Sequence, residues 1–230
     1  MEKQQYNLCL EILRRLNRAG VLNDIMLIGS WCMPFYRDYF SGVAYAPAIM
    51  TRDIDFLVPN PGKVRGETDI PALLKDLGFI VGYSGSEGYI KLEHPSLMVE
   101  FLSPEKGREM NKPVKIPRLG VNAVALRYLN FLVDDAIKVN VEGFTLCLPH
   151  PVNFALHKLI IFQQRDKKDK AEKDKKAAIM ILRTLMKKGD SGVIRAVFDS
   201  TPLPWRKSIL NGLPNVEDKD IVQILTGSSV

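Results

Sequence analysis

The alternation of apolar and polar residues predicts that the first part of the chain mixes strands and helices. Residues 3–19 place apolar side chains three and four positions apart, which is the spacing of a helix with one buried face. Short apolar runs predict buried strands, at 25–28, 54–58 and 96–102. Two hairpins are expected, at 79–93 and 136–148, because in each case two apolar runs flank a glycine-containing turn.

Further helices are predicted from their boundary residues. Ser30 is expected to cap a helix that continues to about Phe40, and the aromatic residues crowded into it are typical of a core rather than of a base-stacking surface. Asp69 is expected to cap another helix, which Gly78 ends. From Pro149 onward the apolar spacing is helical.

These elements predict two domains of different class. Residues 1–148 combine helices with a mixed sheet, which is an α/β (α+β) layer architecture, and residues 149–230 form a small all-helical domain. A basic, proline-punctuated loop is expected over Pro104–Arg118, and the apolar segment Val121–Leu132 is of undecided type.

Composition narrows the class of protein. The chain has 230 residues, of which 46% are hydrophobic and 25% charged, as is usual for a globular protein. Cys9, Cys32 and Cys147 are far apart and odd in number, so a reducing compartment is expected. We find no signal-peptide pattern and expect a cytoplasmic protein with no membrane partner. A net charge of +6 permits polyanionic partners without requiring them.

The candidate chemistry begins at Gly29 and Ser30. A glycine turn into a helix N-terminus presents backbone N–H groups that suit a phosphate. Asp53 and Asp55 are two apart in a predicted strand, so their carboxylates leave one face, roughly 6–7 Å apart. Two hard oxygen ligands beside a phosphate-binding turn suit a Mg²⁺–nucleotide complex. The alternative is a solvated strand face next to an ordinary turn.

Glu100 offers a third carboxylate. It is the only charged residue in the apolar run Ser96–Leu102. A buried strand rarely carries a lone acid unless that acid is paired or bound to a metal ion. Glu100 is therefore the candidate that would complete a metal site with the two aspartates.

A glycine-serine turn into a helix, an Asp-x-Asp pair on a strand and a lone acid on a later strand resemble the polymerase β-type nucleotidyltransferase superfamily. The stretch Thr51–Leu57 is most similar to small bacterial members of uncharacterised substrate. The resemblance implies a nucleotidyltransferase-like fold over the first domain. It also implies that Asp53, Asp55 and Glu100 bind Mg²⁺ or Mn²⁺ and carry out catalysis, while Gly29 and Ser30 hold the phosphates of an NTP.

A second patch of the resemblance lies in the helical domain, with Lys158, Arg165 and Lys173-Asp174 as its charged residues. It implies that Lys158, Arg165 and Lys173 bind the nucleotide phosphates and that Asp174 orients Arg165 or Lys158. Lys158 and Arg165 are expected on one helix face, since seven residues make two turns. Considered alone, the charged run Arg165–Lys176 is typical of a solvated helical face, with a polyanion clamp as the alternative.

The chain departs from the superfamily in one respect. The spacing from Ser30 to Asp53 is longer than usual, with Tyr36–Met50 inserted, which we interpret as either a substrate lid or a packing loop. The histidines have no metal-ligand spacing. His157 is expected to pack in the core, and His94 and His150 precede prolines and give no sign of a partner.

The resulting hypothesis is transfer of a nucleoside monophosphate from an NTP to an unidentified acceptor, with release of pyrophosphate. The acceptor is a small molecule, a tRNA or a protein, and nucleic acid is left open as a partner. Two alternatives remain. One is a catalytically inactive nucleotidyltransferase fold that binds nucleotides or RNA, and the other is a toxin-like enzyme that adds nucleotides to tRNA or protein.

Overall fold

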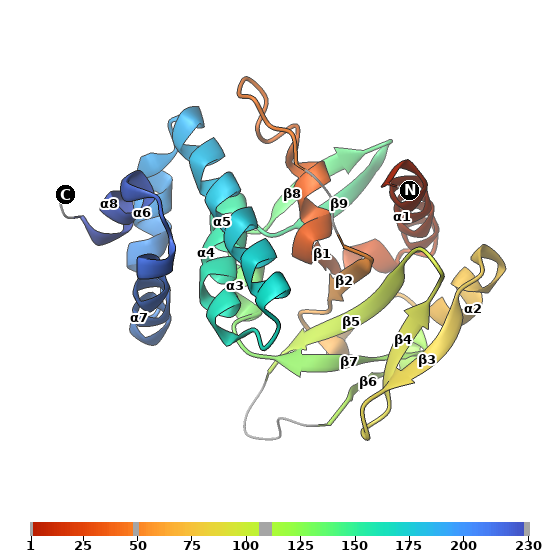
Figure 1. Cartoon of the computed structure of the whole chain (residues 1–230). Helices are drawn as coiled ribbons and strands as arrows, with labels where there is room; N and C mark the ends of the chain where they lie inside the picture. The colour runs from red at the N-terminus through yellow and green to blue at the C-terminus, as the bar shows by residue number, and fades with distance from the viewer. Residues whose placement is uncertain (1, 48–50, 106–111, 228–230) are drawn as a thin grey trace. The chain divides into compact units, whose positions relative to one another are not determined.

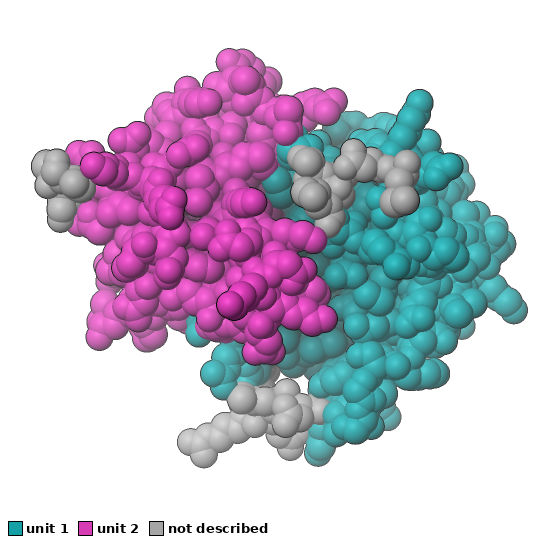
Figure 2. All heavy atoms as spheres, viewed as in Figure 1, with its two compact units in different colours: residues 1–35, 47–149 teal, residues 36–46, 150–230 magenta. Residues whose placement is uncertain are grey.

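The computed structural model describes residues 2–47, 51–105 and 112–227 (Figure 1). The chain divides into two units, residues 1–35 with 47–149 and residues 36–46 with 150–230 (Figure 2). A short piece from the first quarter of the sequence thus belongs to the same unit as the C-terminal helices.

The first unit is built on a mixed sheet with the strand order β1-β2-β5-β4-β3. β1 (Met26–Ile28) is antiparallel to β2 (Asp53–Leu57), and β2 is parallel to β5 (Met98–Pro104). β4 (Tyr89–Glu93) is antiparallel to β5 and forms the predicted hairpin with β3 (Ile80–Ser84). Parallel and antiparallel pairs in one sheet confirm the predicted α/β (α+β) class.

Two further pairs of strands complete this unit. β7 (Val121–Leu126) runs parallel to the end of β5 and antiparallel to β6 (Val114–Ile116). The prediction of a loop over Pro104–Arg118 is therefore wrong at its end, because Val114 and Ile116 pair with β7; residues 106–111 lie outside the described residues. β8 (Ile137–Val141) and β9 (Phe144–Leu148) form the second predicted hairpin.

The helices of the first unit are short apart from the N-terminal one. The segment Val121–Leu132, whose type the sequence left undecided, is divided between strand β7 and helix α3. Asp69 caps α2 as predicted, because its side chain accepts from the Ala72 N–H at 3.0 Å. The helical segments are α1 (Glu2–Arg18), η1 (Val21–Asn23), η3 (Pro61–Lys63), α2 (Ile70–Leu74), η4 (Lys75–Leu77), η5 (Pro117–Leu119) and α3 (Asn130–Val133).

One face of the sheet is wholly apolar at its centre. Ile54 and Phe56 of β2 and Val99 and Phe101 of β5 are at most 1% exposed. The rings of Phe56 and Phe101 stack with their centroids 5.8 Å apart. Because side chains alternate along a strand, Asp53 and Asp55 leave the other face, as the spacing predicted.

That other face is polar at the start of the strands and apolar at their end. Leu57 and Leu102, two residues beyond Asp55 and Glu100, belong to a buried cluster. Its further members are Met26, Ile28, Leu129 and Leu132. The carboxylates are therefore bordered by a packed apolar region in the same layer of the sheet.

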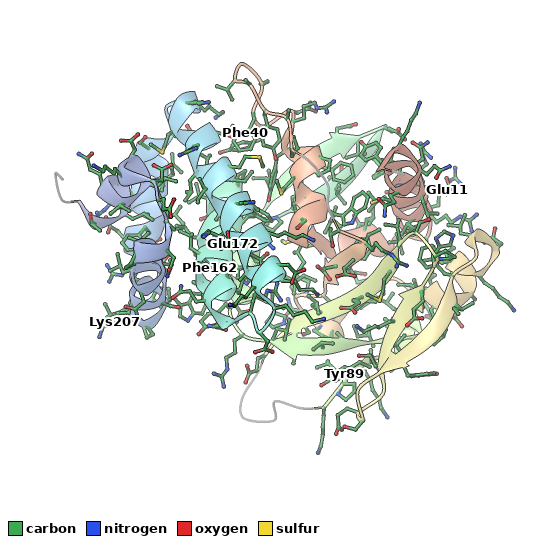
Figure 3. The ribbon with its side chains drawn as sticks, in the orientation of Figure 1. Glu11, Phe40, Tyr89, Phe162, Glu172 and Lys207 are labelled. Atoms are coloured by element: carbon green, nitrogen blue, oxygen red, sulfur yellow. The ribbon has the colours of Figure 1, made fainter. Side chains whose placement is uncertain are left out.

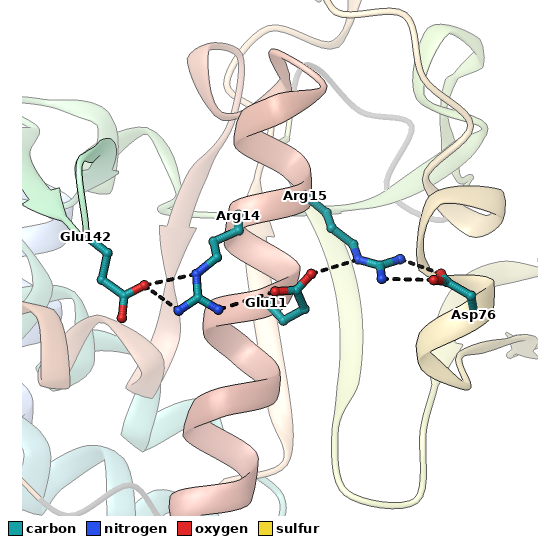
Figure 4. Close-up of polar contacts among 5 residues, drawn as sticks. All are labelled: Glu11, Arg14, Arg15, Asp76 and Glu142. Atoms are coloured by element: carbon teal, nitrogen blue, oxygen red, sulfur yellow. Dashed lines mark hydrogen bonds and ion pairs between the residues drawn. The ribbon is translucent and has the colours of Figure 1, made fainter.

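Helix α1 is tied to its neighbours by a chain of ion pairs (Figure 4). Glu11 bonds to both Arg14 and Arg15. Arg14 also binds Glu142 in the turn of the β8–β9 hairpin, and Arg15 binds Asp76 of η4. These side chains are partly exposed, so we expect the chain of charges to orient α1 more than to stabilise the fold.

Along the chain, β1 is followed by η2 (Gly29–Tyr36), a 3₁₀-helix with Pro34 inside it. The prediction of a helix from Ser30 to about Phe40 is thus wrong in type and length. Pro34 has no N–H to donate, which disfavours a regular α-helix here. The core prediction is confirmed, since Trp31, Tyr36 and Phe40 are at most 1% exposed.

The second unit is helical, as predicted for the C-terminal part. Residues 36–46 belong to this unit because Tyr36 packs edge-on against Phe154, with the ring centroids 5.8 Å apart, and because Phe40 is buried. Phe40 and the buried Phe162 are labelled in Figure 3. The elements of its C-terminal part are α4 (Pro151–Ile161), η6 (Phe162–Gln164), α5 (Lys168–Lys188), α6 (Ser191–Ser200), α7 (Leu203–Gly212), η7 (Leu213–Asn215) and α8 (Lys219–Thr226).

None of the three cysteines, Cys9, Cys32 and Cys147, is in a disulfide. Burial raises the pKa of the Cys9 and Cys147 thiols, so neither is a reactive thiolate. Of the helices in the described part of the chain, none is both long and apolar enough to cross a membrane.

Candidate active site

The register of the sheet brings two of the predicted carboxylates side by side. Asp55 of β2 pairs with Glu100 of β5, and Ile28 of β1 lies on the other side of Asp55. Paired residues of neighbouring strands lie on the same face, roughly 5 Å apart. Asp53 is two residues before Asp55 and shares this face. The sheet thus presents Asp53, Asp55 and Glu100 together.

Gly29 lies directly against Asp55. Its φ is +71°, a left-handed conformation that favours glycine, and it ends β1 at the position after Ile28. A β-carbon at this position would be only 2.6 Å from Asp55 Oδ2. Glycine is thus needed both for the turn and for the close approach. The predicted phosphate-binding turn and the predicted metal ligand touch each other.

Ser30 follows Gly29 at the start of η2 and is half-buried. The expected capped α-helix N-terminus is replaced by a 3₁₀-turn, as described above. The role of Gly29 and Ser30 in holding phosphates stays a prediction. Its geometric basis is now the turn against Asp55 rather than the N-terminus of an α-helix.

Glu100 has a partner that the sequence analysis missed. The register of β4 and β5 pairs Lys91 with Glu100, and Lys91 Nζ forms an ion pair with Glu100 Oε1. The side chain of Glu100 is 19% exposed and that of Lys91 is 24% exposed. Tyr89, which begins β4 two residues before Lys91, is labelled in Figure 3.

A three-residue metal centre is not preformed in the described ranges. Among residues 2–47, 51–105 and 112–227, no group of three histidine, cysteine, aspartate or glutamate side chains is arranged to hold a metal ion. The metal-binding role of Asp53, Asp55 and Glu100 stays a prediction, and so does the choice of Mg²⁺ or Mn²⁺. Asp53 and Asp55 nevertheless supply two hard oxygen ligands on one strand face, which is the donor chemistry that Mg²⁺ prefers.

Two of the charged residues predicted in the second unit, Lys158 and Arg165, contact the same acid, Asp174. Lys158 Nζ pairs with Asp174 Oδ1, and Arg165 Nε donates to Asp174 Oδ2 at 2.8 Å. Burial opposes the ionisation of Asp174, but the two cations outweigh it and hold its pKa below the usual value. The predicted orienting role of Asp174 is therefore seen toward both residues.

The reason for this convergence differs from the predicted one. Helix α4 ends at Ile161, and Arg165 lies in an extended segment after η6, so two turns of continuous helix do not align Lys158 with Arg165. Lys158 is buried, whereas the side chain of Arg165 is 40% exposed. Lys173 lies on the exposed side of α5. Phosphate binding by these three residues stays a prediction.

Two of the histidines have partners that the sequence did not indicate. His150 caps α4, where its Nδ1 accepts from the Val152 N–H at 3.3 Å and its Nε2 lies 3.1 Å from the Tyr39 hydroxyl oxygen. His94 Nδ1 accepts from the Ser96 N–H at 3.1 Å. In each case the ring bonds to a backbone N–H two residues further on, a contact that the sequence pattern did not indicate.

His157 is buried in α4, as predicted for a packing residue. Burial, with a smaller effect of Lys158, lowers its pKa to about 3, so its imidazole is neutral. Its Nε2 has no hydrogen-bond partner within the described part of the chain.

A family model described as a nucleotidyltransferase matches residues 7–197. Among solved structures, the chain is similar to a crystal structure of ANT(2″)-Ia in complex with adenylyl-2″-tobramycin, with 15% identity, a TM-score of 0.49, and 84% of this chain and 97% of that chain covered. No curated protein matches the chain.

Two further solved structures are similar. The solution structure of the antibiotic-resistance factor ANT(2″)-Ia has 14% identity and a TM-score of 0.45, with 87% of this chain and 94% of that chain covered. An antigenic nucleotidyltransferase-like protein from Paracoccidioides brasiliensis has 13% identity and a TM-score of 0.48, with 98% and 93% covered.

Proposed function

Since the chain belongs to this nucleotidyltransferase family, we propose that it transfers a nucleoside monophosphate from an NTP to a hydroxyl group of an acceptor. The site is the polar face formed by Asp53, Asp55 and Glu100, together with the turn at Gly29. The family membership supports the reaction type, and the choice of site rests on this chain's own geometry.

One observation carries the choice of site. The Gly29 turn approaches Asp55 so closely that a β-carbon would lie 2.6 Å from Asp55 Oδ2, and Asp55 is in register with Glu100. A phosphate held at the turn would therefore lie beside two acidic side chains. Acidic groups are unfavourable neighbours for a triphosphate unless a cation lies between them.

The residues present fit a divalent cation. Mg²⁺ is commonly bound by one or two carboxylates together with substrate phosphates and water, and Asp53 and Asp55 would be those two carboxylates. When bound, the ion supplies positive charge to the phosphate oxygens and lowers the pKa of an adjacent hydroxyl.

The chain's own residues would orient the reactants and accept a proton. Backbone N–H groups at Gly29 and Ser30 would hold the phosphates. The acceptor oxygen forms a bond to the α-phosphorus, the bond from that phosphorus to the α,β-bridging oxygen breaks, and pyrophosphate leaves with the bridging oxygen. Glu100 would take the acceptor's proton, as a general base placed beside Asp55.

In the second unit, Arg165 uses its Nε for Asp174. A guanidinium has further N–H groups in a planar fork that suits phosphate, and Asp174 would hold this fork in one orientation. Buried Lys158 would act through Asp174, and exposed Lys173 would add a mobile charge. We propose Arg165 as the principal phosphate-binding side chain of this unit.

The proposal is tested by isothermal titration of ATP, GTP, CTP and UTP in the presence of Mg²⁺, followed by assays of pyrophosphate release. The wild type is compared with Asp53→Asn/Asp55→Asn. Glu87→Gln is the matched control, because Glu87 is an exposed acid in the β3–β4 turn of the same unit. We expect Mg²⁺-dependent binding of at least one NTP to the wild type and the control, and its loss in the double variant.

Two outcomes would contradict the proposal. If the double variant binds NTP and Mg²⁺ as the wild type does, the nucleotide site lies elsewhere. If no NTP binds the wild type, NMP transfer from an NTP by this chain is excluded. Binding without pyrophosphate release in the presence of candidate small-molecule, tRNA and protein acceptors would instead favour the inactive, nucleotide-binding alternative.

A further inference from the structure

Lys91 lies in the same cross-strand row as the proposed catalytic acids. The registers of four strands align Asp55, Glu100, Lys91 and Gly82 in this order across the sheet. Residues paired in this way share one face of the sheet. Lys91 therefore lies on the same face of the sheet as Asp53, Asp55 and Glu100, where the pairing of β4 with β5 positions it.

Glu100 lies between an acid and a base. On the β2 side its neighbour is Asp55, and on the β4 side its neighbour is Lys91, which already pairs with Glu100 Oε1. Both members of the pair are more than three-quarters buried, so water screens their charges less than it would at the surface. A divalent cation that approached the Glu100 carboxylate would be repelled by the Lys91 ammonium, which is already bound to that carboxylate.

We propose that Lys91 is a built-in cation that takes the place of a second divalent ion at Glu100. The site then binds one divalent ion, on Asp53 and Asp55, and Lys91 holds the Glu100 carboxylate in place beside it. This inference rests on the proposed function, because it assigns the single ion to the proposed nucleotide site. It also revises the metal-binding role predicted for Glu100 from the sequence.

Three carboxylates on adjacent positions repel one another, and a charge-balancing cation is required where they are partly buried. Lys91 supplies one positive charge within the chain itself, at the acid farthest from Gly29 in the row. Removing that charge leaves Glu100 beside Asp55 without its ammonium, which is the arrangement that attracts a further divalent ion.

The test counts bound ions rather than turnover. Mn²⁺ alone is titrated into the full chain, and free Mn²⁺ is measured by electron paramagnetic resonance. We expect one ion per chain for the wild type and no ion on this site for Asp53→Asn/Asp55→Asn. Lys91→Met, which keeps the length of the side chain, is expected to bind a second ion whose signal is broadened by coupling to the first.

Three further variants serve as controls. Lys91→Arg keeps the charge and is expected to bind one ion. Lys91→Met/Glu100→Gln is expected to return to one ion, because the second ion needs the Glu100 carboxylate. Lys138→Met removes an exposed lysine from β8, in a separate sheet of the same unit, and is expected to leave the stoichiometry at one.

The outcomes separate this inference from the proposed function. Two ions on the wild type, with one lost in Glu100→Gln, would overturn the role of Lys91 and leave the proposed function standing. One ion on a folded Lys91→Met would also overturn it. If Lys91→Met does not fold, Glu100→Gln decides, since the inference requires it to retain one ion. No ion on the wild type would contradict the proposed metal site and this inference with it.

Discussion

The close approach of Gly29 to Asp55 leads to a prediction about Gly29→Ala. The substitution adds one methyl group at a point where the backbone turns out of β1. Its β-carbon would lie 2.6 Å from Asp55 Oδ2, which is about 0.8 Å inside the 3.4 Å at which ordinary contact begins. The carboxylate is the flexible end of a side chain, so we expect it to move while the fold is retained.

The expected effect of Gly29→Ala has two parts, one on folding stability and one on binding of the Mg²⁺–NTP complex. A residue other than glycine at φ +71° costs roughly 1–2 kcal/mol of folding free energy. Displacement of the carboxylate affects binding instead, because metal–ligand distances tolerate only about 0.2 Å. We therefore expect binding of the Mg²⁺–NTP complex to weaken at least about tenfold, which is about 1.4 kcal/mol, in addition to the loss of stability.

Gly20→Ala separates the two parts. Gly20 has φ +72°, almost the value of Gly29, but a methyl group added there would meet no described atom within 4 Å other than those of Gly20 and its two chain neighbours. Both variants should lose similar stability in urea unfolding followed by circular dichroism. Isothermal titration should show weakened Mg²⁺–NTP binding only for Gly29→Ala. Equal binding by the two variants would refute the reasoning that Gly29 sets the position of Asp55.

Two predictions concern the second unit. Folding keeps His157 neutral down to a pKa of about 3, whereas an unfolded histidine takes up its proton near 6.5, so stability falls as the pH falls through this window. Urea unfolding should show that the free energy of unfolding falls by about 1.6 kcal/mol between pH 6.5 and 5. His157→Gln should remove this fall, and the same dependence on pH in the variant would contradict the assignment to His157. Asp174→Asn leaves Lys158 buried without its anion and should cost about 3–5 kcal/mol in the same assay. As a control, Glu172→Gln breaks the more exposed ion pair of Glu172 with Lys175 and should lower the free energy of unfolding by less than about 1 kcal/mol. Equal losses of stability in Asp174→Asn and Glu172→Gln would contradict this account.

Local patterns in the sequence were sufficient where the chemistry is local. The two-residue spacing of Asp53 and Asp55 determines that they share a face, whatever the strand pairs with. Asp69 and Gly78 delimit a helical segment because a cap and a left-handed glycine act within one turn. The contact of Asp174 with Arg165 or Lys158 is not local in this sense: the family resemblance implied it, and the structure contains both contacts.

Where residues distant in sequence meet, the pattern alone was insufficient. The register that sets Glu100 beside Asp55 depends on strands about 45 residues apart, and sequence alternation is compatible with any shift by two residues. Lys91 was missed for the same reason, since it is one of two charged residues, with Glu93, on an ordinary hairpin strand. Its pairing could have been considered only once the β4–β5 register was known.

The division of the chain has a consequence for its synthesis on the ribosome. Residues 36–46 emerge early, but the helices with which they pack begin only at residue 150. At roughly 5–20 residues per second, Tyr36 and Phe40 wait roughly 5–20 s for the partners that bury them. During this interval an aromatic segment is exposed on the nascent chain, so production in cells should depend on chaperones that shield such segments. Slowing translation after residue 46 would lengthen this exposure and should lower the yield of folded protein.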